Sequence, residues 1–135
     1  MHSAQRDSQV AIPLNLVEAI NRALRQAMED DDSVVLLGED IATNGGVFRA
    51  TEGLKEHFGL RRVMDTPLAE NLIAGMSVGM ASQGLKPVAE IQFMGFILPT
   101  MEQLIGHAAR LRNRTRGRLH CPLVIRVPFG GGIHA

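Results

Sequence analysis

RVMDTPLAENLIAGMSVGMASQGLKPVAEIQF, residues 62–93, is the stretch that decides the fold. Its first part is a very short extended run, and we expect Pro67 to lie in the first turn of the helix that follows. This helix should continue to about Gln83, where Gly84 ends it. The apolar run PVAEIQF then predicts a buried strand. A strand, a helix and a strand in this order predict two parallel strands joined by a crossover helix.

The same alternation extends toward the N-terminus. Apolar residues at helical spacing after position 15 predict a helix that Asn15 caps, with Glu18 completing a capping box. The run SVVLLGED predicts a buried strand over about residues 34–37. A short helix should follow in TEGLKEHFG, with Thr51 as its cap and Gly59 as its end.

The alternation also extends toward the C-terminus. Residues 97–114 have helical periodicity, and residues 121–128, CPLVIRVP, predict a fourth strand. The whole pattern predicts an α/β fold in which helices cover both faces of a parallel, doubly wound sheet. We expect this domain to occupy residues 14–135, after a flexible arm over residues 1–13.

Composition narrows the class of protein. With 135 residues, the chain has room for one domain, and its 45% of apolar residues is typical of a globular protein. The 14 basic and 14 acidic residues balance, which argues against nucleic acid or an anionic membrane as the main partner. A single cysteine, Cys121, fits a reducing compartment. Neither a signal peptide nor a membrane span is visible, so we expect a cytoplasmic protein.

Groups of residues that include glycine, proline, acidic and aromatic side chains follow the ends of the expected strands. The four groups lie at residues 38–40, 65–70, 92–96 and 128–132. Since parallel sheets bind ligands at the carboxyl ends of their strands, these groups predict a ligand site at that edge.

Glu70 begins an apolar run in which the next charged residue is Lys86. Its simplest role is to interact with the helix dipole, which stabilises a helix by about 0.3–1 kcal/mol. The apolar neighbours Leu68, Leu72 and Ile73 favour a second role. A carboxyl group that loses hydration holds a proton more readily, which suits a group that shares a proton with a ligand nitrogen.

Other residues near this edge have open alternatives. Gly95 leaves one face of the Phe96 ring accessible to a flat ligand, although such phenylalanines usually belong to a core. Glu39 is more simply explained by loop solvation or by a backbone contact across the crevice than by catalysis. The glycine runs match no nucleotide-binding fingerprint. Five arginines within residues 110–118 have no interleaved aromatic residue that could stack on bases.

Three stretches carry a family resemblance: LLGEDIATNGGVFRATEGLKEHFG, RVMDTPLAENLIAGMSVGMASQGLKPVAEIQFMGF and RVPFGGGIHA. From about residue 14 to the end, the chain resembles the beta subunit of the decarboxylating component of 2-oxo acid dehydrogenase complexes. The pyruvate and branched-chain types are its two main kinds. The resemblance implies the amino-terminal part of a pyrimidine-binding domain of a thiamine diphosphate enzyme. Beta subunits of the family are longer, and their carboxyl-terminal domain is absent from this sequence.

The resemblance assigns roles to individual residues. The glutamate of the TPLAE motif, here Glu70, is the catalytic residue that contacts N1′ of the cofactor's aminopyrimidine. Phe96 corresponds to the residue that stacks on the pyrimidine, with Gln92 near it and Leu68 of the same motif lining the site. Glu39, in the GED motif, is similar to a residue behind the cofactor at the subunit boundary.

The resemblance also implies partners and ions. Leu123 and Val124 match a stretch whose backbone carbonyls help to hold potassium, whereas magnesium and the diphosphate are held by the alpha subunit. Two alpha and two beta subunits form the component, which passes its acyl group to a lipoyl-bearing acyltransferase. EIQFMGF and PFGGGIH resemble bacterial pyruvate-type subunits more closely, which favours pyruvate over branched-chain 2-oxo acids as the substrate. Alone, this chain should be inactive.

Two other interpretations stay open. A transketolase or deoxyxylulose-phosphate synthase relative would share the pyrimidine domain but carry its diphosphate domain in the same chain. In a non-catalytic assembly module, Glu70 would only stabilise its helix.

Overall fold

The computed structural model describes residues 13–130. Most of the expected arm and the end of the glycine run, residues 131 and 132, lie outside this range. The elements, in chain order, are α1 (Leu16–Asp30), β1 (Val34–Gly38), α2 (Leu54–Phe58), β2 (Val63–Asp65), α3 (Glu70–Ser82), β3 (Lys86–Glu90), the 3-10 helices η1 (Met94–Phe96) and η2 (Leu98–Thr100), the π-helix η3 (Glu102–Ala108), α4 (Ala109–Arg114) and β4 (Val124–Arg126).

The strands form one parallel sheet, as the alternating pattern predicts, and their order in the sheet is β2-β1-β3-β4. Gly38 is level with Asp65 on one side and with Glu90 on the other, and Glu90 is level with Arg126. All strands therefore end at one edge of the sheet, which we call the carboxyl edge.

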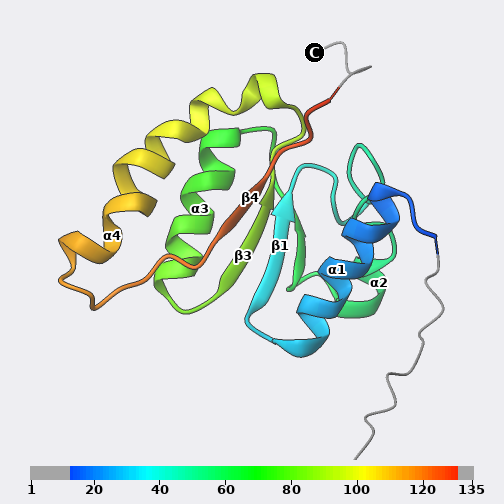
Figure 1. Ribbon diagram of the computed structural model, residues 1–135, viewed down its shortest axis with the longest axis horizontal. Helices are drawn as coiled ribbons and strands as arrows, with labels where there is room; N and C mark the ends of the chain where they lie inside the picture. The colour runs from blue at the N-terminus through cyan, green and yellow to red at the C-terminus, as the bar shows by residue number, and fades with distance from the viewer. Residues whose placement is uncertain (1–12, 131–135) are drawn as a thin grey trace, which may run out of the picture.

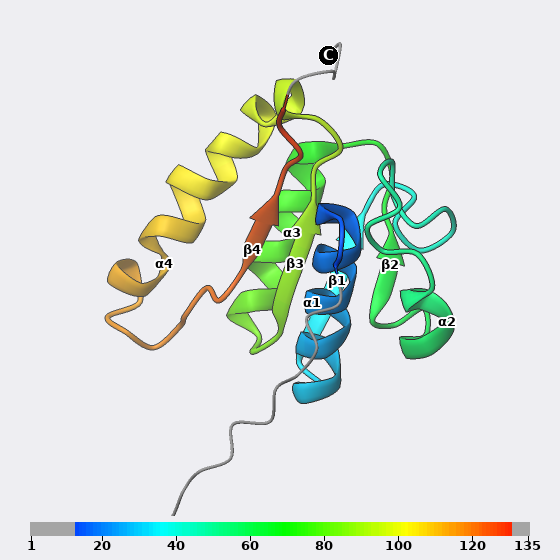
Figure 2. The same cartoon turned by 45° about the vertical axis from the view of Figure 1, so that its right-hand side comes forward.

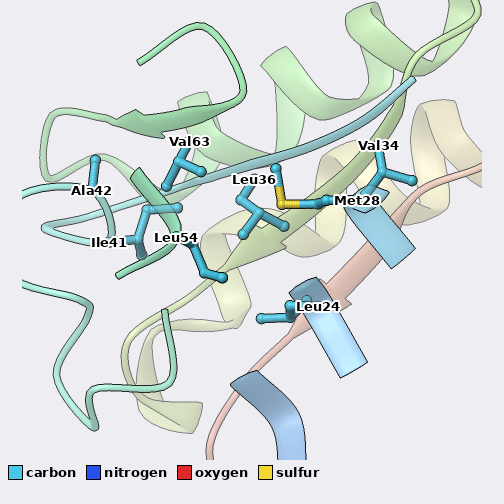
Figure 3. Close-up of a cluster of buried hydrophobic side chains, with 8 residues drawn as sticks. All are labelled: Leu24, Met28, Val34, Leu36, Ile41, Ala42, Leu54 and Val63. Atoms are coloured by element: carbon cyan, nitrogen blue, oxygen red, sulfur yellow. The ribbon is translucent and has the colours of Figure 1, made fainter. Parts of the chain in front are cut away.

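Helices cover both faces of the sheet, so the doubly wound arrangement is confirmed (Figures 1 and 2). Successive residues of a strand point to opposite faces, and β1 shows this directly. Leu36 packs in the cluster that contains Leu24 and Met28 of α1 (Figure 3). Leu37 packs on the other face with Ile73 of α3. Because both faces are covered, every residue of β1 is buried.

Local signals at the helix ends are partly confirmed. Asn15 and Glu18 form the predicted capping box, with bonds of 2.9 and 2.8 Å between each backbone N–H and the other side chain. Gly59 ends α2 as predicted. The prediction that Thr51 caps α2 is wrong, because its hydroxyl donates to the carbonyl of Ile41 (2.7 Å) and the N-cap is Gly53.

The predicted start of α3 is also wrong. The helix begins at Glu70, three residues after Pro67. The reason is that the Thr66 N–H donates to the carbonyl of Gly38 (3.0 Å), which holds the chain across the carboxyl edge before it turns into the helix.

The single helix predicted over residues 97–114 is divided into η2, η3 and α4. Pro99 lacks the N–H that a continuous α-helix needs, and Gly106 has a low helix propensity. Within residues 13–130, no helix is both long and apolar enough to cross a membrane.

Candidate functional site

Asp65 anchors the loop that follows β1. Its carboxylate accepts hydrogen bonds from the backbone N–H groups of Ala42 (2.7 Å) and Thr43 (3.2 Å), and from the Thr43 hydroxyl (2.5 Å). These bonds connect the loop after β1 to the end of β2, the neighbouring strand. The only sequence signal for this role is an acidic residue at a strand end.

Glu39 lies at the start of this loop and is only 6% exposed, so its expected solvation in a loop is wrong. Burial raises the pKa of the Glu39 carboxyl, and the charges of Glu70 and then Asp40 raise it further. The pKa of Glu39 therefore depends in part on the charge of Glu70, which places the two carboxyl groups near each other.

Glu70 is the first residue of α3 and is half-buried. Its predicted apolar surroundings are incomplete in this chain. Ile73 is buried, but Leu68 is 79% exposed and Leu72 is 44% exposed. These two leucines therefore present apolar surface to solvent beside the start of α3 instead of enclosing Glu70.

The segment after β3 brings aromatic rings to the carboxyl edge. Gln92 lies two residues after the end of β3 and is half-buried, whereas Phe96 in η1 is 49% exposed. Phe93 contacts Phe96 edge-to-face, with 6.1 Å between ring centroids, and contacts Phe48 in the same way at 6.2 Å. The space beside Gly95 is open. Nothing in the sequence around Phe48 predicts this contact.

Leu123 and Val124 do not join this group. Val124 is the first residue of β4 and pairs with Val88, so both lie toward the opposite end of the strand. Potassium binding by their carbonyls stays a prediction. Across residues 13–130, no three His, Cys, Asp or Glu side chains gather as a metal site.

Three side chains at the carboxyl edge are of the chemical kinds that could hold an aminopyrimidine ring. Glu70 offers a carboxyl group for a ring nitrogen, Gln92 offers an amide, and Phe96 has an accessible ring for stacking. The Thr66 hydroxyl is buried without a hydrogen-bond partner among the described residues, so one more polar group at this edge is unsatisfied.

Comparison with known proteins agrees with this fold. Residues 13–135 match the family described as the transketolase pyrimidine binding domain. The chain is 57% identical over 122 residues to the pyruvate dehydrogenase E1 component subunit beta of Acholeplasma laidlawii, covering 90% of this chain and 37% of that protein. Two Bacillus subtilis proteins, the 2-oxoisovalerate dehydrogenase subunit beta and the pyruvate dehydrogenase E1 component subunit beta, are each 50% identical over 121 residues, with the same coverage of 90% and 37%.

The chain thus spans little more than a third of these relatives. The two Bacillus subtilis proteins are named for different substrates, yet this chain is equally identical to both. Sequence identity to these two proteins therefore does not distinguish pyruvate from branched-chain substrates. The match to the family covers nearly the whole chain and includes every strand of the sheet. The chain therefore belongs to the transketolase pyrimidine-binding domain family.

Proposed function

We propose that this chain forms the pyrimidine-binding half of the active site in a thiamine diphosphate-dependent 2-oxo acid dehydrogenase, with Glu70 as its catalytic carboxyl group. One observation carries this proposal. The carboxyl edge brings together a half-buried Glu70, a buried Glu39 whose pKa responds to it, and the exposed ring of Phe96. The proposed reaction is oxidative decarboxylation with acyl transfer to lipoamide.

When bound, thiamine diphosphate would supply a nucleophilic carbon for the keto group and a ring that can take up the electron pair released with carbon dioxide. In our proposal, Glu70 holds a proton at N1′ of the pyrimidine. Glu39 lies close enough for the Glu70 charge to contribute to its raised pKa, after the larger effect of burial, so it is a neighbouring carboxyl group that supports this site. Phe96 stacks on the ring, and the Gln92 amide and Leu68 orient it.

An exposed apolar surface next to the carboxyl edge supports the proposal that another protein binds there. We call it the apolar rim, and its residues are Leu68, Leu72, Met94, Phe96, Leu98, Met101 and Ile105. Its segments lie around the start of α3 and along η1, η2 and η3, next to the carboxyl edge. Exposed apolar clusters of this kind mark protein interfaces.

We propose that the alpha subunit covers the apolar rim, in an assembly of two alpha and two beta subunits. In this proposal, the alpha subunit covers Leu68 and Leu72 and also excludes water from the Glu70 carboxyl group. The alpha subunit would contribute the diphosphate and magnesium site, and a lipoyl-bearing acyltransferase would receive the acyl group. We place the complex in the cytoplasm and favour pyruvate over branched-chain substrates.

The test compares Glu70→Gln with wild type in the full-length protein that contains this chain, co-expressed with its alpha partner. Glu56→Gln is the matched control, because Glu56 is an exposed glutamate in the first turn of α2, outside the apolar rim. We expect Glu70→Gln to assemble normally but to lose decarboxylation of both pyruvate and 3-methyl-2-oxobutanoate. The control should keep its activity.

Equal activity of Glu70→Gln and wild type would reject the catalytic role and favour an assembly module. If the wild-type complex acted on neither 2-oxo acid but transferred two-carbon units between sugars, a transketolase-like function would replace the proposal.

A further inference from the structure

A buried ion pair closes the carboxyl edge between β3 and β4. Glu90, the last residue of β3, is 3% exposed, and its carboxylate pairs with the guanidinium group of Arg126, the last residue of β4. The two residues are level in the sheet. Burial raises the pKa of Glu90, and the charge of Arg126 opposes this effect. A buried ion pair often adds little net stability, because removing both charges from water is costly. This pair therefore suggests a role other than stabilisation.

The turn at Gly45 and Gly46 rests directly on this pair. Both glycines have positive φ angles, of 74° and 75°, and the Gly46 N–H donates to the carbonyl of Asp40 (3.0 Å). A Cβ atom added at Gly46 would lie 3.0 Å from a carboxylate oxygen of Glu90. Only glycine combines this backbone conformation with so close an approach.

Phe48 follows this turn and connects it to the aromatic rings described above. Its ring contacts Phe93, which in turn contacts Phe96. Phe48 and Arg126 also line the same groove of about 370 Å³, between α1 and the end of β4. A continuous set of contacts therefore leads from the ion pair to the exposed ring of Phe96.

We propose that Glu90 and Arg126 are positioning residues, whose ion pair supports the Gly45–Gly46 turn and thereby sets the orientation of the Phe48, Phe93 and Phe96 rings. The consequence for cofactor binding rests on the proposed function, because it requires Phe96 to stack on the pyrimidine. The orientation of the rings does not depend on that function.

The experiment uses NMR of the 135-residue chain with labelled phenylalanine rings, of which there are only five. One variant replaces the ion pair with neutral residues of similar size, Glu90→Gln with Arg126→Met, because such replacements often preserve folding. A second variant, Gly46→Ala, disturbs the contact and leaves both charges in place. The third, Arg126→Lys, keeps the positive charge.

The matched control removes the other ion pair of the same strand. Lys86 begins β3 and pairs with Asp31 (2.5 Å) at the opposite end of the sheet, so Lys86→Met with Asp31→Asn changes one strand's charges away from the carboxyl edge. We expect the neutral pair and Gly46→Ala to remain folded and to lose the nuclear Overhauser contact between the Phe48 and Phe93 rings. The control and Arg126→Lys should keep it.

A second readout is the KM for thiamine diphosphate in the assembled enzyme. We expect it to rise about tenfold in the neutral pair, as the loss of one aromatic stacking contact allows, with kcat less affected. An intact Phe48–Phe93 contact in both folded test variants would overturn the positioning role. A lost contact with an unchanged KM would instead confirm the positioning role and reject the stacking role of Phe96 in the proposed function.

Discussion

Replacing Asp65 tests whether one side chain holds the loop after β1. Asp65→Ala removes the acceptor for three hydrogen-bond donors, namely two backbone N–H groups and the Thr43 hydroxyl. The Thr43 groups lie at the surface and can bond to water, but Ala42 is buried, so its N–H would lose its partner. An unsatisfied buried donor costs about 1–3 kcal/mol, and we expect Asp65→Ala to lower the free energy of unfolding by about 2 kcal/mol.

Urea denaturation measures this loss, and amide hydrogen exchange locates it. Exchange should accelerate at Ala42 and Thr43 more than at Leu36 in the centre of the sheet. Asp32→Ala is the control, since the Asp32 side chain is fully exposed and makes one ion pair, with Arg62 (3.2 Å), so we expect a change of less than about 0.5 kcal/mol. A loss at Asp65 no larger than at Asp32, or unchanged exchange at Ala42, would refute this reasoning.

Three further predictions concern stability. Arg62→Met should lower the free energy of unfolding by about 3 kcal/mol in urea denaturation, because the Arg62 guanidinium bonds to the carbonyls of Met28, Asp31 and Val34 at 2.8–3.2 Å; wild-type stability would contradict it. Asn15→Ala should cost about 1 kcal/mol by the same measurement, because α1 loses its capping box, and an unchanged midpoint would argue against this cap. Because the folded state raises the pKa of Glu39 above its ordinary value of 4.5, its contribution is most favourable below that pH and is lost as pH rises through the folded pKa. Glu39→Gln should therefore flatten the pH dependence of unfolding above pH 4.5, and an unaltered profile would contradict this.

Features that depend on local chemistry or strict alternation were predictable from the sequence. The apolar run before Gly38 and the helix–strand alternation predict a parallel sheet, because each pattern leaves few other ways to bury its residues. The Asn15 cap is predictable because both of its partners lie within one turn. The gathering of the four residue groups at one edge then follows from the parallel topology.

Features that depend on contacts between distant segments were not predictable. Thr51 has the composition of a cap but bonds to Ile41, and Pro67 precedes α3 because Thr66 bonds to β1. The contact of Phe48 with Phe93 joins residues separated by two strands and two helices. Glu70 is incompletely enclosed because Leu68 and Leu72 are exposed to solvent. An apolar stretch of sequence does not indicate which of its residues are exposed.

The central claim is that Glu70 holds a proton at the pyrimidine of thiamine diphosphate. A crystal structure of the assembled complex with the cofactor bound tests it most directly. Our account predicts a Glu70 carboxyl oxygen at about 2.5–3.2 Å from N1′, with Leu68 and Leu72 covered by the partner. A Glu70 side chain that points into solvent, away from the pyrimidine, would contradict it.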